Sequence, residues 1–150
     1  MSLETQINND IKQAMLAKDK DVLESLRAIK SALLLLKTSK EAVDGVVPES
    51  VEIATLQKLV KQRRETADIY HQQNRPDLAE AELLQASVIE RYLPQQMDRA
   101  ELETALRSII EEVGAASPRD MGKVMGVASK RLAGRADNKV VSEIVKSLLS

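Results

Sequence analysis

Apolar residues recur every three to four positions along most of the chain, and no segment shows sustained alternation of apolar and polar residues. This period places apolar side chains on one face of a helix. Residues 3–15 carry one such stripe, and residues 22–36 carry a stronger one after the polar stretch 18–21. Asp21, three residues before Glu24, is expected to cap the second helix. The two segments predict an antiparallel helical hairpin.

Two further helices are predicted in the first part of the chain. Residues 38–50 contain glycine, proline and mixed polar residues, and are expected to form an exposed loop. A third helix is expected over residues 51–70 and a fourth over residues 76–92. The fourth begins with proline, which is favoured in the first turn of a helix.

The stretch Tyr-Leu-Pro-Gln-Gln at 92–96 is predicted to separate two domains. Pro94 disfavours helical geometry at Leu93, so the helical pattern is expected to stop there. We therefore predict an N-terminal helical domain of about four helices at 1–93 and a C-terminal domain at 97–150.

Three helix starts joined by short links follow this boundary, and they predict a C-terminal three-helix bundle. Asp98 is expected to cap the first helix, and Gly114 is expected to end it. Ser117, followed by proline, marks the start of a second helix that is expected to end near Gly134. Asp137 is expected to cap the third helix. The whole chain is thus predicted to be all-α.

The composition agrees with this fold and narrows the chemistry. Hydrophobic residues make up 43% of the 150 residues, while Phe and Trp are absent and only two Tyr are present, so the core must be aliphatic. The absence of cysteine excludes disulfides, thiolate metal sites and cysteine nucleophiles. His71, the only histidine, is interpreted as a solvated side chain in a polar loop. We predict no catalytic residue, no metal and no cofactor.

The N-terminal segment and the apolar runs of the chain are relevant to the cellular location of the protein. The N-terminal segment Met-Ser-Leu-Glu-Thr-Gln is polar and acidic, unlike a signal peptide. The longest apolar run, at 32–36, is much too short to cross a bilayer. The default expectation is a soluble cytoplasmic protein without membrane contact. The oligomeric state is left open, because any helix stripe could serve a dimer.

Positive charge gathers in one part of the chain. Residues 117–146 hold seven basic and three acidic side chains, although the net charge of the whole chain is −1. A local excess of positive charge attracts phosphate. The aromatic residues that stack on unpaired bases are absent there, so a nucleic-acid contact would involve a backbone or a folded shape. Exposed basic residues are the candidates for phosphate contacts: Lys123 and Arg135 first, then Lys130, Arg131 and Lys139.

Glycines are unusually placed in the same region. Gly122 and Gly126 lie one turn apart within a predicted helix, where each costs about 1 kcal/mol relative to alanine. We predict that a neighbouring helix packs closely against them. Gly134 is predicted to adopt the left-handed conformation that follows a helix, for which glycine is favoured.

Five motifs resemble the YqeY-like proteins in their order and spacing: K-Q-R-R-E-T (61–66), R-P-D-L-A-E (75–80), Y-L-P-Q-Q (92–96), M-G-K-V-M-G (121–126) and G-R-A-D-N-K-V-V (134–141). The resemblance covers essentially the whole chain, and the last two motifs are fairly specific when taken together. Proline at position 76 departs from the family, which more often has an acidic residue there.

The resemblance implies an N-terminal helical domain and a C-terminal domain similar to the tail domain of the GatB subunit of the glutamine-dependent tRNA amidotransferase. That tail helps to hold the tRNA, and a similar module is attached to some glutaminyl-tRNA synthetases. Family-level labels also mention carbon–nitrogen ligase activity with glutamine as amido-N-donor. The sequence contains neither a nucleotide-binding loop nor an amidase nucleophile pattern that would perform it.

Three hypotheses follow from the sequence. We favour a non-catalytic accessory module that binds tRNA or related RNA through the C-terminal bundle. The first alternative is a protein-interaction module that uses the glycine-lined face or the first helical hairpin. The second and less favoured alternative is a part of a glutamine-dependent amidotransferase system. Salt-dependent tRNA binding separates the first two, and glutamine-dependent product formation identifies the third.

Overall fold

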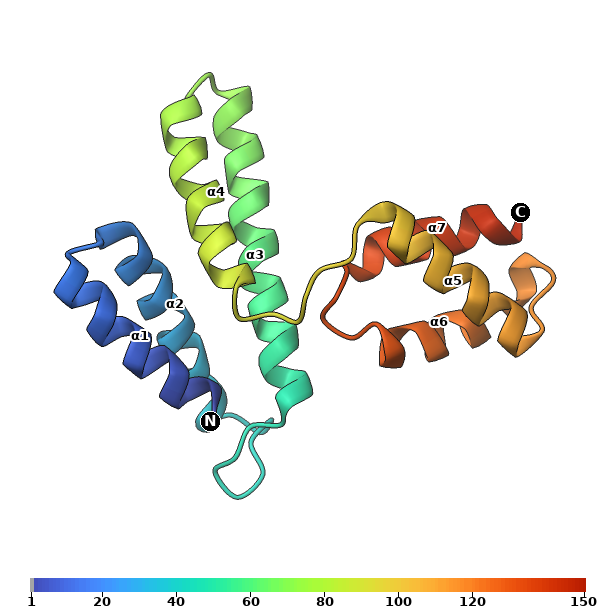
Figure 1. The fold of residues 1–150 in the computed structure, drawn as a ribbon, viewed down its shortest axis with the longest axis horizontal. Helices are drawn as coiled ribbons and strands as arrows, with labels where there is room; N and C mark the ends of the chain where they lie inside the picture. The colour runs from blue at the N-terminus through green and yellow to red at the C-terminus, as the bar shows by residue number, and fades with distance from the viewer. Residues whose placement is uncertain (1) are drawn as a thin grey trace. The chain divides into compact units, whose positions relative to one another are not determined.

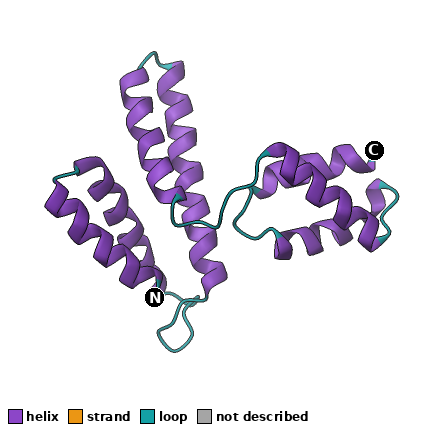
Figure 2. Cartoon of the chain, in the orientation of Figure 1, coloured by secondary structure: helices purple, strands orange, loops and turns teal. Residues whose placement is uncertain are grey.

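The computed structural model describes residues 2–150. This part of the chain contains seven α-helices, one short 3-10 helix and no strand (Figures 1 and 2). The all-α prediction is therefore confirmed. Contacts along the chain divide it into two compact units, Met1–Leu93 and Pro94–Ser150, which we call the N-terminal unit and the C-terminal unit.

The N-terminal unit consists of two helical hairpins. They are formed by α1 (Leu3–Ala17) with α2 (Lys20–Lys37), and by α3 (Glu49–Gln72) with α4 (Pro76–Glu90). The second hairpin is the longer one, and α2 packs against α4 (Figure 1). The core between them is aliphatic, and its largest fully buried side chains are Ile7, Leu26, Ile29, Leu56, Val88 and Ile89.

The turn between α1 and α2 differs from the prediction in its capping residue. Asp19, and not Asp21, caps α2, because Asp19 Oδ1 accepts a hydrogen bond from Val22 N at 3.3 Å. Lys18 has the left-handed conformation that ends α1, with φ 57°. Asp21 already lies in the first turn of α2, where its negative charge interacts favourably with the helix dipole.

The first helix of the second hairpin, α3, is longer than the sequence pattern indicated, whereas α4 ends two residues earlier than predicted. His71, predicted in a loop, lies in the last turn of α3 and is exposed. Two arginines of the K-Q-R-R-E-T motif join α3 to α4: Arg63 Nε donates to Gln85 Oε1 at 3.0 Å, and Arg64 pairs with Glu90. The motif therefore helps to hold α3 against α4.

The loop between α2 and α3 contains a tight turn. Val43 and Val46 exchange both backbone hydrogen bonds, at 2.8 and 3.0 Å. Asp44 and Gly45 between them have φ values of 53° and 77°. Asp-Gly is a favoured pair for such a turn because both central residues need a positive φ.

Tyr92 ties the chain after α4 back to α1. Its hydroxyl donates to Asp10 Oδ2 at 2.5 Å, and burial together with this bond raises the pKa of Tyr92.

We expect Tyr92→Phe to lower the free energy of unfolding by about 1–2 kcal/mol, because a partly buried hydrogen bond to a carboxylate is lost. Urea denaturation, monitored by far-UV circular dichroism, measures the change in the free energy of unfolding. Tyr70→Phe is the matched control, since the structure shows no hydrogen bond of the Tyr70 hydroxyl within the described residues. Equal stability of the two variants would contradict the prediction.

The C-terminal unit contains α5 (Arg99–Val113), the 3-10 helix η1 (Pro118–Asp120), α6 (Met121–Arg131) and α7 (Asn138–Leu149). Each of the three α-helices contacts the other two. Together they enclose a second aliphatic core, to which the main contributors are Leu102, Leu106, Ile109, Val124, Ile144 and Val145.

Three predicted helix ends in this unit are confirmed. Asp98 accepts a hydrogen bond from Glu101 N at 2.8 Å, Gly114 is left-handed with φ 70°, and Asp137 accepts from Lys139 N at 2.9 Å. These ends could be predicted because each depends on residues at most three positions apart.

The start of the second helix in the C-terminal unit differs from the prediction. Ser117 precedes η1, and its side chain makes no capping hydrogen bond. Asp120 stabilises this turn instead, because its Oδ2 accepts from Ala116 N at 3.0 Å. This bond lowers the pKa of the Asp120 carboxyl, with a smaller contribution from the charge of Lys123.

Candidate nucleic-acid interface

α6 presents two glycines and two lysines to solvent. Gly122, Lys123, Gly126 and Lys130 are all exposed. A helix turns by about 100° per residue, which places these four residues within an arc of about 100°. We call this surface the α6 face. The buried side of the same helix points into the core of the C-terminal unit.

The prediction that a helix packs against Gly122 and Gly126 is wrong within the C-terminal unit. A Cβ atom at either position would meet nothing within 4 Å among the described residues outside the local helix. Val124 and Ala128 are the buried residues of α6, and they lie roughly opposite the glycines. The glycines therefore leave bare backbone at the surface.

Gly134 has the predicted left-handed conformation, with φ 76°, and is buried. It does not end the helix directly, because α6 ends at Arg131 and Leu132 occupies the C-cap.

The open surroundings of the α6 glycines predict a gain in stability on substitution. Gly122→Ala and Gly126→Ala are each expected to raise the free energy of unfolding by up to about 1 kcal/mol, because alanine favours helix and meets no neighbour. Thermal denaturation measures the change. Gly114→Ala is the control and is expected to lose stability, since residue 114 has a positive φ. A loss at 122 or 126 would mean that these positions are packed.

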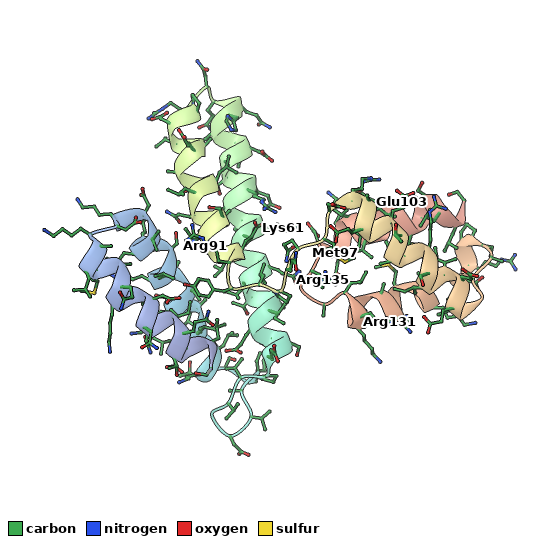
Figure 3. The ribbon with its side chains drawn as sticks, viewed as in Figure 1. Lys61, Arg91, Met97, Glu103, Arg131 and Arg135 are labelled. Carbon is green, nitrogen blue, oxygen red and sulfur yellow. The ribbon has the colours of Figure 1, made fainter. Side chains whose placement is uncertain are left out.

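Arg135 is not the exposed side chain that the sequence analysis predicted. It is half-buried, and its Nε donates to the carbonyl oxygen of Gln95 at 3.0 Å. Its own carbonyl oxygen accepts from Met97 N at 3.0 Å, and both residues are labelled in Figure 3. Gln96 Nε2 donates to Gly134 O at 2.6 Å. The turn after α6 thus holds the segment that precedes α5.

Arg131 is also engaged, because it makes two hydrogen bonds to the Glu112 carboxylate, one of them 2.7 Å long. This pairing lowers the pKa of Glu112. The side chains of the remaining three candidates make no hydrogen bond or ion pair within the described residues, and all are exposed: Lys123, Lys130 and Lys139. The structure therefore leaves the lysines most available to a ligand.

The charges of the C-terminal unit are unevenly distributed. Residues 98–113, which include α5, hold five acidic and two basic side chains. Residues 117–146, which include α6 and most of α7, hold seven basic and three acidic ones. A polyanion is therefore attracted toward the α6 and α7 side and repelled by α5.

Neither a cluster of metal-ligating side chains nor a membrane-spanning helix is present among the described residues. Residues 2–150 contain no group of three or more acidic or histidine side chains placed to hold a metal ion. Among the same residues, no helix has both the length and the apolar character that a membrane span needs.

Comparison with known proteins adds a family and several relatives. The model of the Yqey-like protein family matches residues 4–149. The relatives include three fungal proteins named Altered inheritance of mitochondria protein 41, mitochondrial. That of Pyrenophora tritici-repentis is 26% identical over 147 residues, which cover 96% of this chain and 79% of the relative.

The match covers a smaller share of the other two relatives. The protein of Clavispora lusitaniae is 31% identical over 118 residues, covering 76% of this chain and 66% of the relative. That of Meyerozyma guilliermondii is 32% identical over 128 residues, covering 83% and 65%. The matched region thus spans about two thirds of these two relatives.

The expectation of a cytoplasmic location is contradicted by these relatives, because each is named as a mitochondrial protein. That expectation rested on the polar composition of residues 1–6 and on the shortness of the apolar runs. Neither feature distinguishes the cytosol from the mitochondrial interior, so the physical argument could not have decided between them.

Proposed function

This chain belongs to the YqeY-like protein family, and from that premise we propose that it is a non-catalytic accessory protein whose C-terminal unit binds the phosphate backbone of tRNA or similarly folded RNA. The α6 face is the observation that carries this proposal. Two surface glycines without packing neighbours lie there beside Lys123 and Lys130.

The bare backbone of the α6 face suits close approach by a phosphodiester chain. A side chain at either glycine would hold a ligand away from the helix, whereas glycine allows sugar and phosphate groups to reach its surface. Lys123 and Lys130 then supply positive charge at the edge of the contact. The cost of two glycines in a helix is explained by such a ligand and not by packing within the C-terminal unit.

The composition of the C-terminal unit favours recognition of folded RNA. Both tyrosines of the chain lie in the N-terminal unit, so the C-terminal unit has no aromatic side chain on which bases could stack. Binding then depends on the RNA backbone and its shape. The acidic side chains along α5 restrict the orientation of the RNA by repelling it from that side.

The proposal extends to the organisation of the chain. The two compact units are taken to be a four-helix N-terminal domain and a three-helix C-terminal domain that acts like the tail domain of GatB. Their separate hydrophobic cores support this assignment. In this view, Arg135 contributes mainly by fixing the turn after α6, and the lysines contribute the phosphate contacts.

The test is the affinity of the full chain for a tRNA at two salt concentrations. We expect weak binding whose logarithm of affinity falls by about 0.7–0.9 per phosphate contact for each decade of salt. An unstructured single-stranded RNA of equal length is the control and is expected to bind less tightly. Lack of tRNA binding at low salt would contradict the proposal and would favour a protein partner for the α6 face.

A further inference from the structure

A pocket of about 450 Å³ lies within the N-terminal unit, between the α1–α2 hairpin and the end of α4. The pocket is shallow and widely open to solvent, and its volume is in the range of small-molecule sites in proteins. The RNA-binding proposal makes no use of it. Three segments line it: α1, the start of α2, and the two residues that follow α4, Arg91 and Tyr92.

The apolar part of the pocket is formed by α1 and α2. Ala14 and Ala17 are small residues on one side of α1, and they leave the space that larger side chains would fill. Val22 of α2 completes the apolar surface, and the fully buried Leu26 lies beneath it. An aliphatic group of a ligand would be removed from water there, which contributes about 25 cal/mol per Å² of buried apolar area.

The polar part of the pocket carries charges of both signs. Asp10 and Asp19 supply two carboxylates, and Arg91, labelled in Figure 3, supplies a guanidinium at the end of α4. Asp10 Oδ2 accepts from the Tyr92 hydroxyl, and Asp19 Oδ1 accepts from the backbone of α2. Among the described residues, the other oxygen of each carboxylate makes no hydrogen bond and is available to a ligand. Arg91 is exposed, and its side chain makes no ion pair within the described residues.

We propose that this pocket binds a small zwitterion, namely an α-amino acid with an aliphatic side chain. The ammonium group lies near the Asp10 and Asp19 carboxylates, and the carboxylate pairs with the Arg91 guanidinium. The aliphatic side chain packs on Ala14, Ala17 and their apolar neighbours. A simple anion would be repelled by two carboxylates, and a simple amine would gain no interaction with the Arg91 guanidinium.

The ligand chemistry is tested by two analogues of leucine. Leucinamide lacks the carboxylate, and N-acetylleucine lacks the ammonium group. Full-length ¹⁵N-labelled protein is titrated with each compound, and chemical shifts of the backbone amides report binding. We expect saturable shifts with leucine at millimolar concentrations, centred on the pocket residues, and at least about tenfold weaker binding of both analogues.

Two variants assign the charges. Arg91→Ala is expected to weaken leucine binding and to abolish its advantage over leucinamide. Asp10→Asn keeps an acceptor for the Tyr92 hydroxyl and is expected to abolish the advantage of leucine over N-acetylleucine. Arg99→Ala, an exposed change in the C-terminal unit, is the matched control and is expected to bind leucine normally.

Absence of saturable shifts with leucine would overturn the proposal, and so would equal binding of all three compounds. Shifts centred on the C-terminal unit would also overturn it. The result is independent of RNA binding, because the pocket residues all belong to the N-terminal unit.

Discussion

Leu106→Ala is expected to unfold the C-terminal unit while the N-terminal unit remains folded. Leu106 is fully buried in the middle of the C-terminal core. Truncation of such a leucine costs about 2–5 kcal/mol, and a core of this size provides only a few kcal/mol of net stability. The loss is therefore comparable to the whole stability of the unit.

The distribution of aromatic residues allows the two units to be observed separately. Tyr70 and Tyr92 are the only aromatic residues of the chain, and both lie in the N-terminal unit. Near-UV circular dichroism therefore reports on the N-terminal unit, whereas far-UV circular dichroism reports on the helices of both. We expect Leu106→Ala to lose far-UV signal at 25 °C and to keep its near-UV signal and its thermal transition.

Leu35→Ala is the control for the chemical change, because Leu35 is 72% exposed, and it is expected to alter neither signal. Loss of the near-UV signal in Leu106→Ala would show that the two units fold as one. A fully retained far-UV signal would show that the C-terminal core is more stable than its size indicates. The first result contradicts the prediction of two independently folding domains, and the second contradicts the expected unfolding of the C-terminal unit.

The sequence predicted those features of the fold that depend on neighbouring residues. The helices could be predicted from the spacing of apolar residues, because the buried residues of α5 and α7 lie on one face of each helix. Asp98, Gly114 and Asp137 were recognised because each acts within its own turn. Asp19 was missed because Asp21 precedes the same apolar stripe, and local sequence does not determine which of the two lies outside the helix.

The candidate site depended on information of longer range. Arg135 donates a hydrogen bond to the carbonyl oxygen of Gln95, which lies 40 positions earlier in the chain. No local sequence pattern reveals such a partner. The orientation of Gly122 and Gly126 could have been derived, because Val124 and Ala128 fix the inward side of α6. Spacing of the two glycines by itself does not distinguish a packed face from an open one.

Simultaneous change of Lys123 and Lys130 to glutamate is expected to abolish most RNA binding without unfolding the protein. Both side chains are exposed and lie on the α6 face. Lys123 and Lys130 are preferred to Arg135, since replacing Arg135 would also break its bond to Gln95. A variant with Lys12 and Lys40 changed to glutamate is the matched control, because it changes the net charge equally at exposed positions of the N-terminal unit.

The size of the effect follows from counterion release. With a salt exponent near 0.8 per contact, each phosphate contact contributes about tenfold to the affinity at 0.05 M salt relative to 1 M salt. Loss of two contacts should therefore lower tRNA affinity at 0.05 M salt by about 100-fold and reduce the salt slope by about 1.6. The control variant should lose much less affinity and keep the slope, because its changed residues belong to the N-terminal unit and are not part of the proposed contact. Equal losses in both variants would mean that total charge, and not the α6 face, governs binding. An unchanged affinity and slope in the folded Lys123 and Lys130 variant would remove the α6 face from the RNA interface.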